Sequence, residues 1–164
     1  MTAPLLRDAT PADFAAIVRL NAESVQFTST MDDAKLRRFY AMAAYLRVAV
    51  VDGQGAAFLL AFAADAPYWS ENFRWFRERY GRFLYIDRIV VDAPHRGRGL
   101  GRLLYEDLFA FARSQGCAHV TCEFDVEPPN AASAAFHARF GFREVGSRQV
   151  TYADKRVAMQ EAPL

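Results

Sequence analysis

The stretch at residues 96–102, RGRGLGR, restricts the fold of this chain more than any other part of the sequence. It follows a β-rich run at residues 83–92 and leads into a segment that takes helical apolar spacing from Leu100. In a strand, loop and helix of this kind, backbone N–H groups and the positive end of the helix dipole converge on one point. The glycines leave the backbone open to close approach, and the arginines supply forked donors. The stretch therefore predicts a site for a phosphate or pyrophosphate group.

Two other phosphate-binding loops do not fit the same stretch. A Walker loop needs Gly-Lys-Ser/Thr, and residues 96–102 contain no lysine. The dinucleotide fingerprint G-x-G-x-x-G also fails, because Arg102 stands where the third glycine is required.

The remaining apolar patterns predict strands and helices along the whole chain. They are a strand at residues 5–7, helices at 10–25 and 31–44, strands at 45–51 and 56–63 joined by a turn at 52–55, a strand at 83–92, a helix at 100–115, a strand at 118–126, a helix at 130–140, and strands at 142–150 and 156–161. This order predicts a mixed α/β fold with helices on both faces of one sheet, whose centre holds residues 83–92 beside 118–126. Because 52% of the 164 residues are hydrophobic and no linker interrupts them, we expect a single domain over residues 1–164.

Composition excludes several classes of function. The 20 Lys and Arg nearly balance the 19 Asp and Glu, so no global field attracts nucleic acid or an anionic membrane. Cys117 and Cys122 have no second cysteine pair at zinc-ligand spacing, so we expect reduced thiols and no metal site. The sequence shows no signal-like start and no run of about 18 apolar residues. We therefore expect a cytoplasmic protein with neither nucleic acid nor membrane as a partner.

Two motifs resemble those of the GNAT superfamily of N-acetyltransferases. Arg96-x-x-Gly99-x-Gly101 after a strand looks like the family's acetyl-CoA loop. After one more predicted strand, residues 130–142 carry Asn130-x-x-Ser133-x-x-Phe136-His137-x-x-Phe140-Gly141-Phe142, which resembles the second signature. The order of predicted elements is also similar over nearly the whole chain. The resemblance implies the GNAT fold, a splayed mixed sheet with the cofactor wedged between its two central strands.

The resemblance also implies that the chain binds acetyl-CoA and transfers the acetyl group to an amine by direct attack in a ternary complex. Backbone groups at residues 89–91 would pair with the pantetheine amides, and one N–H there would serve as an oxyanion donor. Asn130 would contact the pantetheine arm, and as the residue that opens a helix it can also be an N-cap. The implied cofactor-binding residues are Ile89, Val90, Val91, Arg96, Gly97, Arg98, Gly99, Leu100, Gly101, Arg102, Asn130, Ser133 and His137.

Acetyl transfer needs a base for the amine, donors for the carbonyl oxygen and an acid for the leaving thiolate. Asp87 is the first base candidate, since it stands nine residues before Arg96, similar to the general-base glutamate of histone-acetylating family members. Its alternative role is an ion pair with Arg88 or another basic residue. Glu123 is the second, because residues 118–126 alternate sharply between apolar and polar. The polar face of this predicted strand either borders a cleft or is simply exposed to solvent.

His137 is the candidate for the acid. Family members often carry a tyrosine at this position, which protonates the departing thiolate. An imidazole with a pKa of about 6.5 could donate that proton. The alternative is that His137 is a packing or surface residue of its helix.

The residues that would bind the acceptor amine are less clearly indicated by a sequence motif. Residues 65–82 form an insertion in which Trp69, Phe73, Phe76 and Tyr80 take helical spacing. This aromatic stripe packs on the core, caps an acceptor pocket, or joins two subunits of a homodimer. In the family fold the junction at residues 21–33 faces the same cleft, which makes Asn21, Glu23 and Ser24 candidate acceptor contacts.

A small-molecule amine is the expected acceptor, and acetylation of a protein amine is the alternative. A non-catalytic acyl-CoA sensor would keep the loop at 96–102 and lack a working base and acid. A nucleic-acid-binding module would have to depend on the local arginines alone, which the near-zero net charge disfavours.

Overall fold

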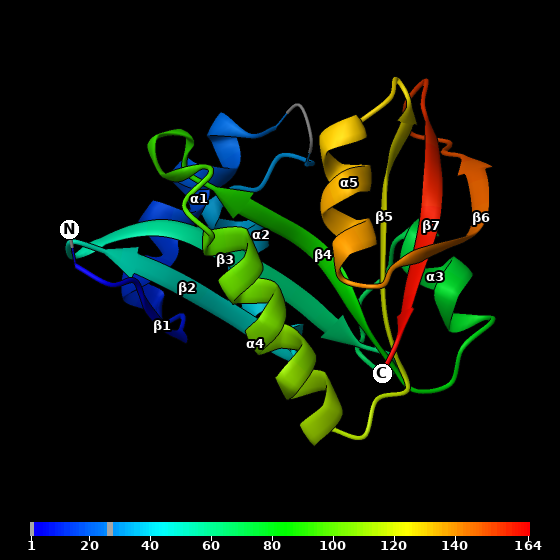
Figure 1. Cartoon of the computed structure of the whole chain (residues 1–164), viewed down its shortest axis with the longest axis horizontal. Coiled ribbons are helices and arrows are strands. Elements are labelled where there is room, and N and C mark those ends of the chain that lie inside the picture. The colour runs from blue at the N-terminus through cyan, green and yellow to red at the C-terminus, as the bar shows by residue number, and fades with distance from the viewer. Residues whose placement is uncertain (1, 26–27) are drawn as a thin grey trace. The chain divides into compact units, whose positions relative to one another are not determined.

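The structure, a computed structural model, describes residues 2–25 and 28–164. Its elements are β1 (Leu5–Asp8), α1 (Phe14–Glu23), α2 (Asp33–Met42), β2 (Tyr45–Val51), β3 (Gln54–Ala63), α3 (Glu71–Arg77), β4 (Phe83–Val91), α4 (Leu100–Ser114), β5 (His119–Glu127), α5 (Ala131–Arg139), β6 (Arg143–Gln149) and β7 (Arg156–Pro163) (Figure 1). The strand order is β1-β2-β3-β4-β5-β7-β6, and both parallel and antiparallel pairs occur. The predicted mixed α/β class is confirmed, and so is the position of β4 beside β5.

The chain divides into two compact units. The first holds Met1–Tyr68 and Ile86–Ala110, and the second holds Trp69–Tyr85 and Phe111–Leu164. Strand β4 and helix α4 each run from one unit into the other. The single domain over residues 1–164 stays a prediction.

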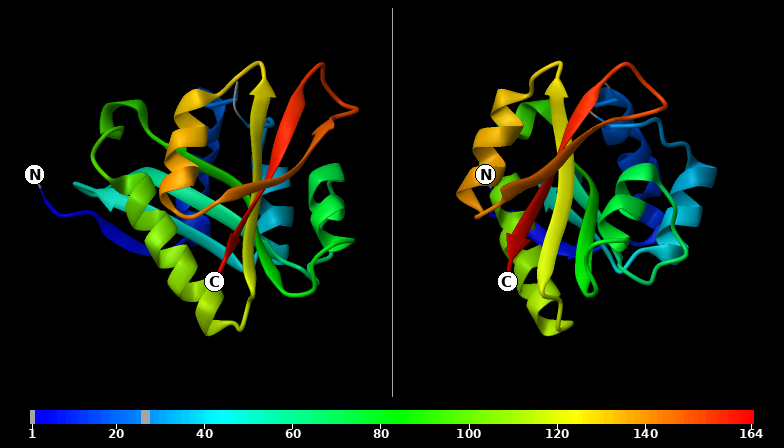
Figure 2. Two further views of the ribbon diagram at one scale, coloured as in Figure 1. Left: turned by 45° about the vertical axis from the view of Figure 1, so that its right-hand side comes forward. Right: turned by 90° about the vertical axis from the view of Figure 1, so that its right-hand side faces the viewer.

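The β2–β3 hairpin belongs to the first unit. Asp52 and Gly53 form its two-residue turn with φ of 50° and 78°, the left-handed conformation that a tight hairpin turn requires. Strand β3 therefore begins at Gln54, before the predicted start at Ala56. Its residues from Ala56 to Phe62 are all buried. Figure 2 shows the reason, since α1 and α2 lie on one side of these strands and the first turns of α4 on the other.

The first two helices are present with shifted ends. The backbone N–H of Thr10 donates to the Asp13 carboxylate over 2.8 Å, and Pro11–Asp13 forms a short 3-10 turn, so α1 begins only at Phe14. The carboxylate of Asp32 accepts from the backbone N–H of Lys35 over 2.8 Å and caps α2. Local hydrogen bonds at the N-terminus of each helix thus decide where that helix begins.

Three antiparallel strands, β5, β7 and β6, form the second unit, together with the first residues of β4. Phe83 to Tyr85 pair in parallel with His119 to Thr121. Helices α3 and α5 lie on opposite faces of these strands (Figure 2). The predicted alternation along β5 is confirmed, because the Phe124 ring lies 5.3 Å from the ring of His137 on α5, while Glu123 bonds to α3.

Both cysteines are free thiols, as expected from the sequence. Cys117 is half-buried and Cys122 is buried in β5. Desolvation raises the pKa of both thiols, most strongly that of Cys122. They are therefore protonated at neutral pH and poor nucleophiles.

We predict that Gly146→Ala destabilises the protein. A Cβ on Gly146 in β6 would lie 2.6 Å from Cζ2 of Trp75, which packs from α3 against the strand. The indole must shift, and we expect the free energy of unfolding in urea to fall by about 1–2 kcal/mol. Gly81→Ala is the matched control, because a Cβ there meets no described atom within 4 Å. Equal effects of the two changes would contradict the packing of Trp75 on Gly146.

Candidate functional site

The loop predicted to bind phosphate belongs to the first unit and keeps its backbone open. Gly97 and Gly99 have φ of 75° and 81°, a conformation that side chains with a Cβ rarely adopt. A Cβ built on either glycine would meet no described atom within 4 Å. Helix α4 begins directly after Gly99, whose carbonyl accepts from the Leu103 N–H over 2.9 Å. The geometry fits a loop that leads an anionic group to a helix N-terminus.

Arginines surround this loop on the exposed surface. Arg96, Arg98 and Arg102 are all exposed. Nε of Arg96 donates to the Val91 carbonyl over 3.3 Å, and Nε of Arg102 bonds to Glu106 over 2.6 Å. Both side chains keep further guanidinium donors beyond these bonds. Val90 is buried between Ile89 and Val91, which are half-buried, so the three implied pantetheine partners lie in the same unit as the loop.

Asp87 lies in β4 as part of a buried ion pair. Its side chain is 6% exposed, and the carboxylate accepts from the Tyr68 hydroxyl over 2.6 Å and from Nε of Arg88 over 2.7 Å. The ion pair with Arg88, the alternative to the base role, is therefore present. The base role stays a prediction, and Tyr68 is a partner that no sequence pattern indicated.

Arg88 ties the junction between α1 and α2 to β4. Its guanidinium donates to Oδ1 of Asn21 and to the carbonyl and hydroxyl oxygens of Ser29, each over 2.9 Å. Asn21 is 1% exposed, so its side chain serves Arg88 rather than the surface. Ser24 is also buried, and Glu23 pairs with Arg19 at the surface. Asn21 and Glu23 thus make contacts within the protein, and Ser24 is buried in it.

The predicted junction at residues 21–33 also includes Gln26 and Phe27, which lie outside the described residues. The acceptor role of Asn21, Glu23 and Ser24 stays a prediction.

Glu123 lies on the α3 side of β5, in the second unit. Its Oε1 accepts from the Tyr85 hydroxyl over 2.8 Å and from Nδ2 of Asn72 over 2.9 Å. Thr121 on the same side is fully buried. The alternative of a simply exposed sheet is therefore wrong for this end of β5, because α3 covers it. The aromatic spacing of residues 65–82 indicated the helix but gave no signal for Asn72.

The second predicted motif forms α5. Asn130 caps the helix, since its Oδ1 accepts from the Ser133 N–H over 3.2 Å. His137 is 6% exposed, and its Nδ1 lies 2.7 Å from the Ser133 carbonyl. The imidazole packs among the rings of Phe124, Phe136 and Phe142. Desolvation lowers the pKa of His137, although the bond to Ser133 opposes it.

His137 is thus a packing residue that is neutral at physiological pH. Its role as the acid stays a prediction, and burial works against the charged imidazolium form.

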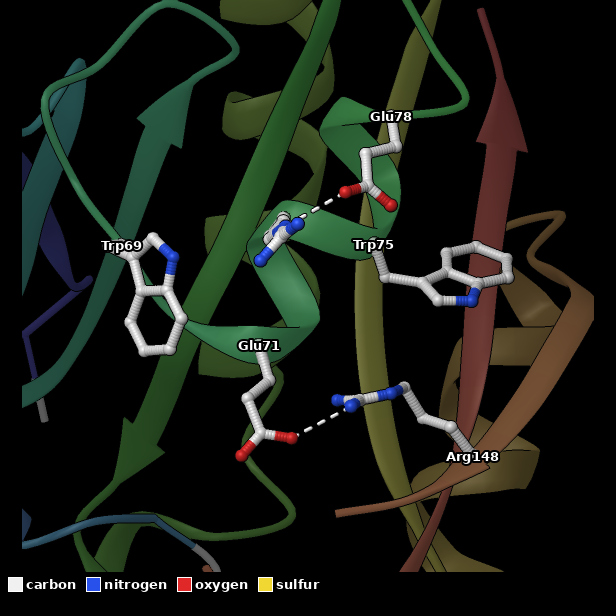
Figure 3. Close-up of a pocket in the computed structure, with 6 residues that line it drawn as sticks. Trp69, Glu71, Trp75, Glu78 and Arg148 are labelled. Carbon is white, nitrogen blue, oxygen red and sulfur yellow. Dashed lines mark hydrogen bonds and ion pairs between the residues drawn. The ribbon is translucent and has the colours of Figure 1, made fainter. Parts of the chain in front are cut away.

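The insertion divides between core and surface. Phe73 and Phe76 of α3 are buried against the rings of Phe83 and Tyr85, as the packing interpretation predicted. Trp69, by contrast, is 69% exposed. It lines an open pocket of about 220 Å³ together with Glu71, Arg74, Trp75, Glu78 and Arg148 (Figure 3).

The charges in this pocket are matched within it. Arg148 bonds to Glu71 over 2.7 Å, and Arg74 bonds to Glu78 over 2.8 Å, as the dashed lines in Figure 3 mark. The guanidinium of Arg79 stacks 3.9 Å from the centre of the Trp75 ring. The pocket therefore offers indole surface without a surplus of charge.

Comparison with known proteins identifies the family. The profile of the acetyltransferase (GNAT) family matches residues 14–142, which is most of the chain. This chain belongs to the GNAT family. The resemblance that the loop at 96–102 and the motif at 130–142 suggested is confirmed.

Individual relatives of this GNAT chain agree with the family. A phosphinothricin N-acetyltransferase of Streptomyces coelicolor is 35% identical over 111 residues, 65% of this chain and 59% of that protein. A rice glucosamine 6-phosphate N-acetyltransferase is 38% identical over 71 residues, 43% of this chain and 40% of that protein. The chain thus matches less than two thirds of the length of these relatives.

A solved structure shows the same fold over the full length. The Salmonella typhimurium protein yncA, solved with acetyl-CoA as its cofactor, superimposes with a TM-score of 0.72 at 23% identity. The superposition covers 99% of this chain and 95% of yncA.

Residues 2–25 and 28–164 contain no group of three or more His, Cys, Asp or Glu side chains placed to hold a metal ion. No helix in the same residues is long and apolar enough to cross a lipid bilayer.

We predict that His137 makes stability depend on pH. Because the folded pKa is lowered, the unfolded chain binds more protons once the pH falls below about 6.5. The contribution of neutral His137 is complete above that pH and is lost as the pH falls toward the lower folded pKa. Urea unfolding between about pH 7.5 and 5 should show a steeper loss for the wild type than for His137→Leu. An equal loss of stability in His137→Leu and in the wild type would contradict this prediction.

Proposed function

We propose that this GNAT chain is an acetyl-CoA-dependent N-acetyltransferase that acts on the amine of a small molecule. The observation that carries the proposal is the open loop at residues 96–102, with two left-handed glycines at the start of α4. The family match, and the acetyl-CoA that yncA was solved with, support the choice of cofactor. The names of the phosphinothricin and glucosamine 6-phosphate relatives support a small-molecule acceptor.

In this proposal the loop binds the cofactor and the strands supply polar groups. Backbone N–H groups of residues 97–101 and the exposed Arg96 and Arg98 hold the pyrophosphate. Backbone groups of Ile89 to Val91 hold the pantetheine arm, and one N–H there stabilises the carbonyl oxygen. Asn130 and Ser133 add contacts from α5. Acetyl-CoA supplies the acetyl group as a thioester.

The reaction moves one acetyl group and one proton. The lone pair of the neutral amine forms the new C–N bond, the C–S bond breaks, and the sulfur leaves as a thiolate. Asp87 or Glu123 takes the proton that the amine loses. Asp87 would act beside Arg88 and the Tyr68 hydroxyl, whereas Glu123 would act beside two neutral donors. The thiolate takes up a proton from His137 or from water.

Acetylation of a protein amine is the alternative acceptor, and an acyl-CoA sensor is the alternative function. The sensor would bind acetyl-CoA without releasing thiol. We also propose a cytoplasmic location and leave homodimer formation as a prediction.

The direct test is binding followed by turnover. Acetyl-CoA should raise the melting temperature, because a ligand that binds only the folded state stabilises it. Free thiol should then appear when acetyl-CoA is mixed with phosphinothricin, glucosamine 6-phosphate, other small amines, or a peptide with a free N-terminus. Binding without thiol release from any amine would favour the sensor, and activity on the peptide alone would favour the protein acceptor.

Gly99→Val should abolish the shift in melting temperature. A β-branched residue at φ of 81° strains the turn, and its side chain would enter the approach path of the pyrophosphate. Gly53→Val is the matched control, since Gly53 has φ of 78° in the hairpin turn of the same unit. That change should lower stability and leave cofactor affinity intact. Normal acetyl-CoA binding by a folded Gly99→Val protein would exclude the loop as the site.

Asp87→Asn should lower kcat about a hundredfold at neutral pH while acetyl-CoA affinity stays within about twofold. The loss should shrink at high pH, where the acceptor amine deprotonates without help. Glu123→Gln is the comparison, measured over the same pH range. If Glu123→Gln alone gives the pH-dependent loss, Glu123 is the base. If neither change alters the profile, solvent takes the proton and the enzyme acts by holding its substrates together.

A further inference from the structure

Lysine is scarce in this chain, which contains only Lys35 and Lys155 beside 18 arginines. A guanidinium keeps its proton, so the lysines are the basic side chains that can become neutral amines and take an acetyl group. The Lys155 ammonium belongs to the second unit and pairs with Asp125 over 3.1 Å. Lys35 belongs to the first unit and lies in the first turn of α2. The two lysines therefore differ in their surroundings within one protein.

The start of α2 holds the side chain of Lys35 against the segment before the helix. Its backbone N–H is fixed by the Asp32 cap over 2.8 Å, and its Nζ lies 5.4 Å from the centre of the Phe39 ring. Nζ donates to the Thr30 carbonyl over 2.8 Å and to the Ser29 hydroxyl oxygen over 3.2 Å. Both of these residues are exposed, and Lys35 is half-buried. The nitrogen is thus oriented by the protein at a position close to the surface.

The two acceptors of Nζ match the donors of a neutral amine. An ammonium group has three N–H donors, whereas a neutral amine has two N–H donors and one lone pair. When Thr30 and Ser29 accept the two N–H groups, the remaining position of the nitrogen is its lone pair. A lone pair is the group that attacks a thioester carbonyl carbon.

The charges around Lys35 favour this neutral form. Desolvation lowers the pKa of Lys35, and the positive charge of Arg88 lowers it further. Arg38 acts in the same direction, while Asp87 and Asp32 oppose the shift without reversing it. Acetylation would turn the amine into an uncharged amide and so remove a positive charge from beside two arginines.

Ser29 links Lys35 to the strand that we propose binds acetyl-CoA. Its hydroxyl oxygen accepts from Nη2 of Arg88 over 2.9 Å as well as from Lys35. Arg88 bonds to Asp87 over 2.7 Å and directly precedes Ile89, the first residue assigned to the pantetheine arm. All of these residues belong to the first unit, together with the cofactor loop. One hydroxyl oxygen therefore separates the amine from the strand residue that lies between the base candidate and the pantetheine segment.

We propose that this protein acetylates itself at Lys35, whose amine takes the acetyl group of acetyl-CoA bound to the same chain. The inference rests on the proposed function, because it uses the same cofactor site. The lone pair of Nζ forms the new C–N bond, the C–S bond of the thioester breaks, and the sulfur leaves as a thiolate. The nitrogen loses one proton and the thiolate takes up one, so the products are acetylated Lys35 and CoA.

The test incubates the full chain with acetyl-CoA and no added amine. Mass spectrometry of peptides should show Lys35 acetylated at least about tenfold faster than Lys155, because an amine held near the thioester has a high effective concentration. The rate per chain should not depend on protein concentration. Lys35→Arg keeps a positive charge and should lose the release of about one thiol per chain, while acetyl-CoA still raises its melting temperature. Equal acetylation of the two lysines, or a rate per chain that rises with protein concentration, would overturn the inference.

Two reagents separate this inference from the proposed function. N-acetoxysuccinimide needs no CoA site and should acetylate Lys35 at least about threefold faster than Lys155, since more of Lys35 is neutral. An excess of desulfo-CoA should suppress only the reaction with acetyl-CoA. Unselective acetylation by the small reagent, or acetylation by acetyl-CoA that persists in desulfo-CoA, would contradict self-acetylation. If acetyl-CoA raises the melting temperature without acetylating Lys35, the inference fails and the proposed function stands. If acetyl-CoA gives no such rise, both fail.

Discussion

A carboxylate that leaves water must be met by hydrogen-bond donors, and the described polar groups of this protein are arranged around that requirement. Asp87 shows it in the first unit, where Arg88 and Tyr68 both donate to the carboxylate. Arg88 in turn needs acceptors for its remaining N–H groups, and Asn21 and Ser29 supply them. One buried charge in β4 thus fixes the end of α1 and the segment that leads into α2.

The same requirement operates on the α3 side of the second unit. Glu161 of β7 is fully buried, and His119 and Arg143 from the two neighbouring strands bond to it. Glu123 accepts from the hydroxyl of Tyr85 and the amide of Asn72. Both carboxylates on this side are thus tied to groups from neighbouring elements, Glu161 to the adjacent strands and Glu123 to β4 and α3.

The loop at residues 96–102 depends on a different constraint, the conformation of its backbone. Its two left-handed residues turn the chain directly into α4 and leave the N–H groups uncovered by side chains. This local requirement is written in the sequence, because few residues other than glycine adopt such φ values. It explains why the loop and the family could be predicted from a few letters, while the partners of Asp87 and Glu123 could not.

The sequence alone determined the mixed α/β class, most of the elements to within a few residues, the loop, and the N-cap at Asn130, since these depend on local periodicity and backbone preference. It also predicted the alternation along β5. Only the tertiary structure decided that His137 packs among three phenylalanines, that Asp87 pairs with Arg88 and Tyr68, and that Asn72 reaches Glu123. Tyr68 is 19 residues from Asp87 and Asn72 is 51 residues from Glu123. Contacts over such separations follow from how strands and helices pack, and no local pattern in the chain records them.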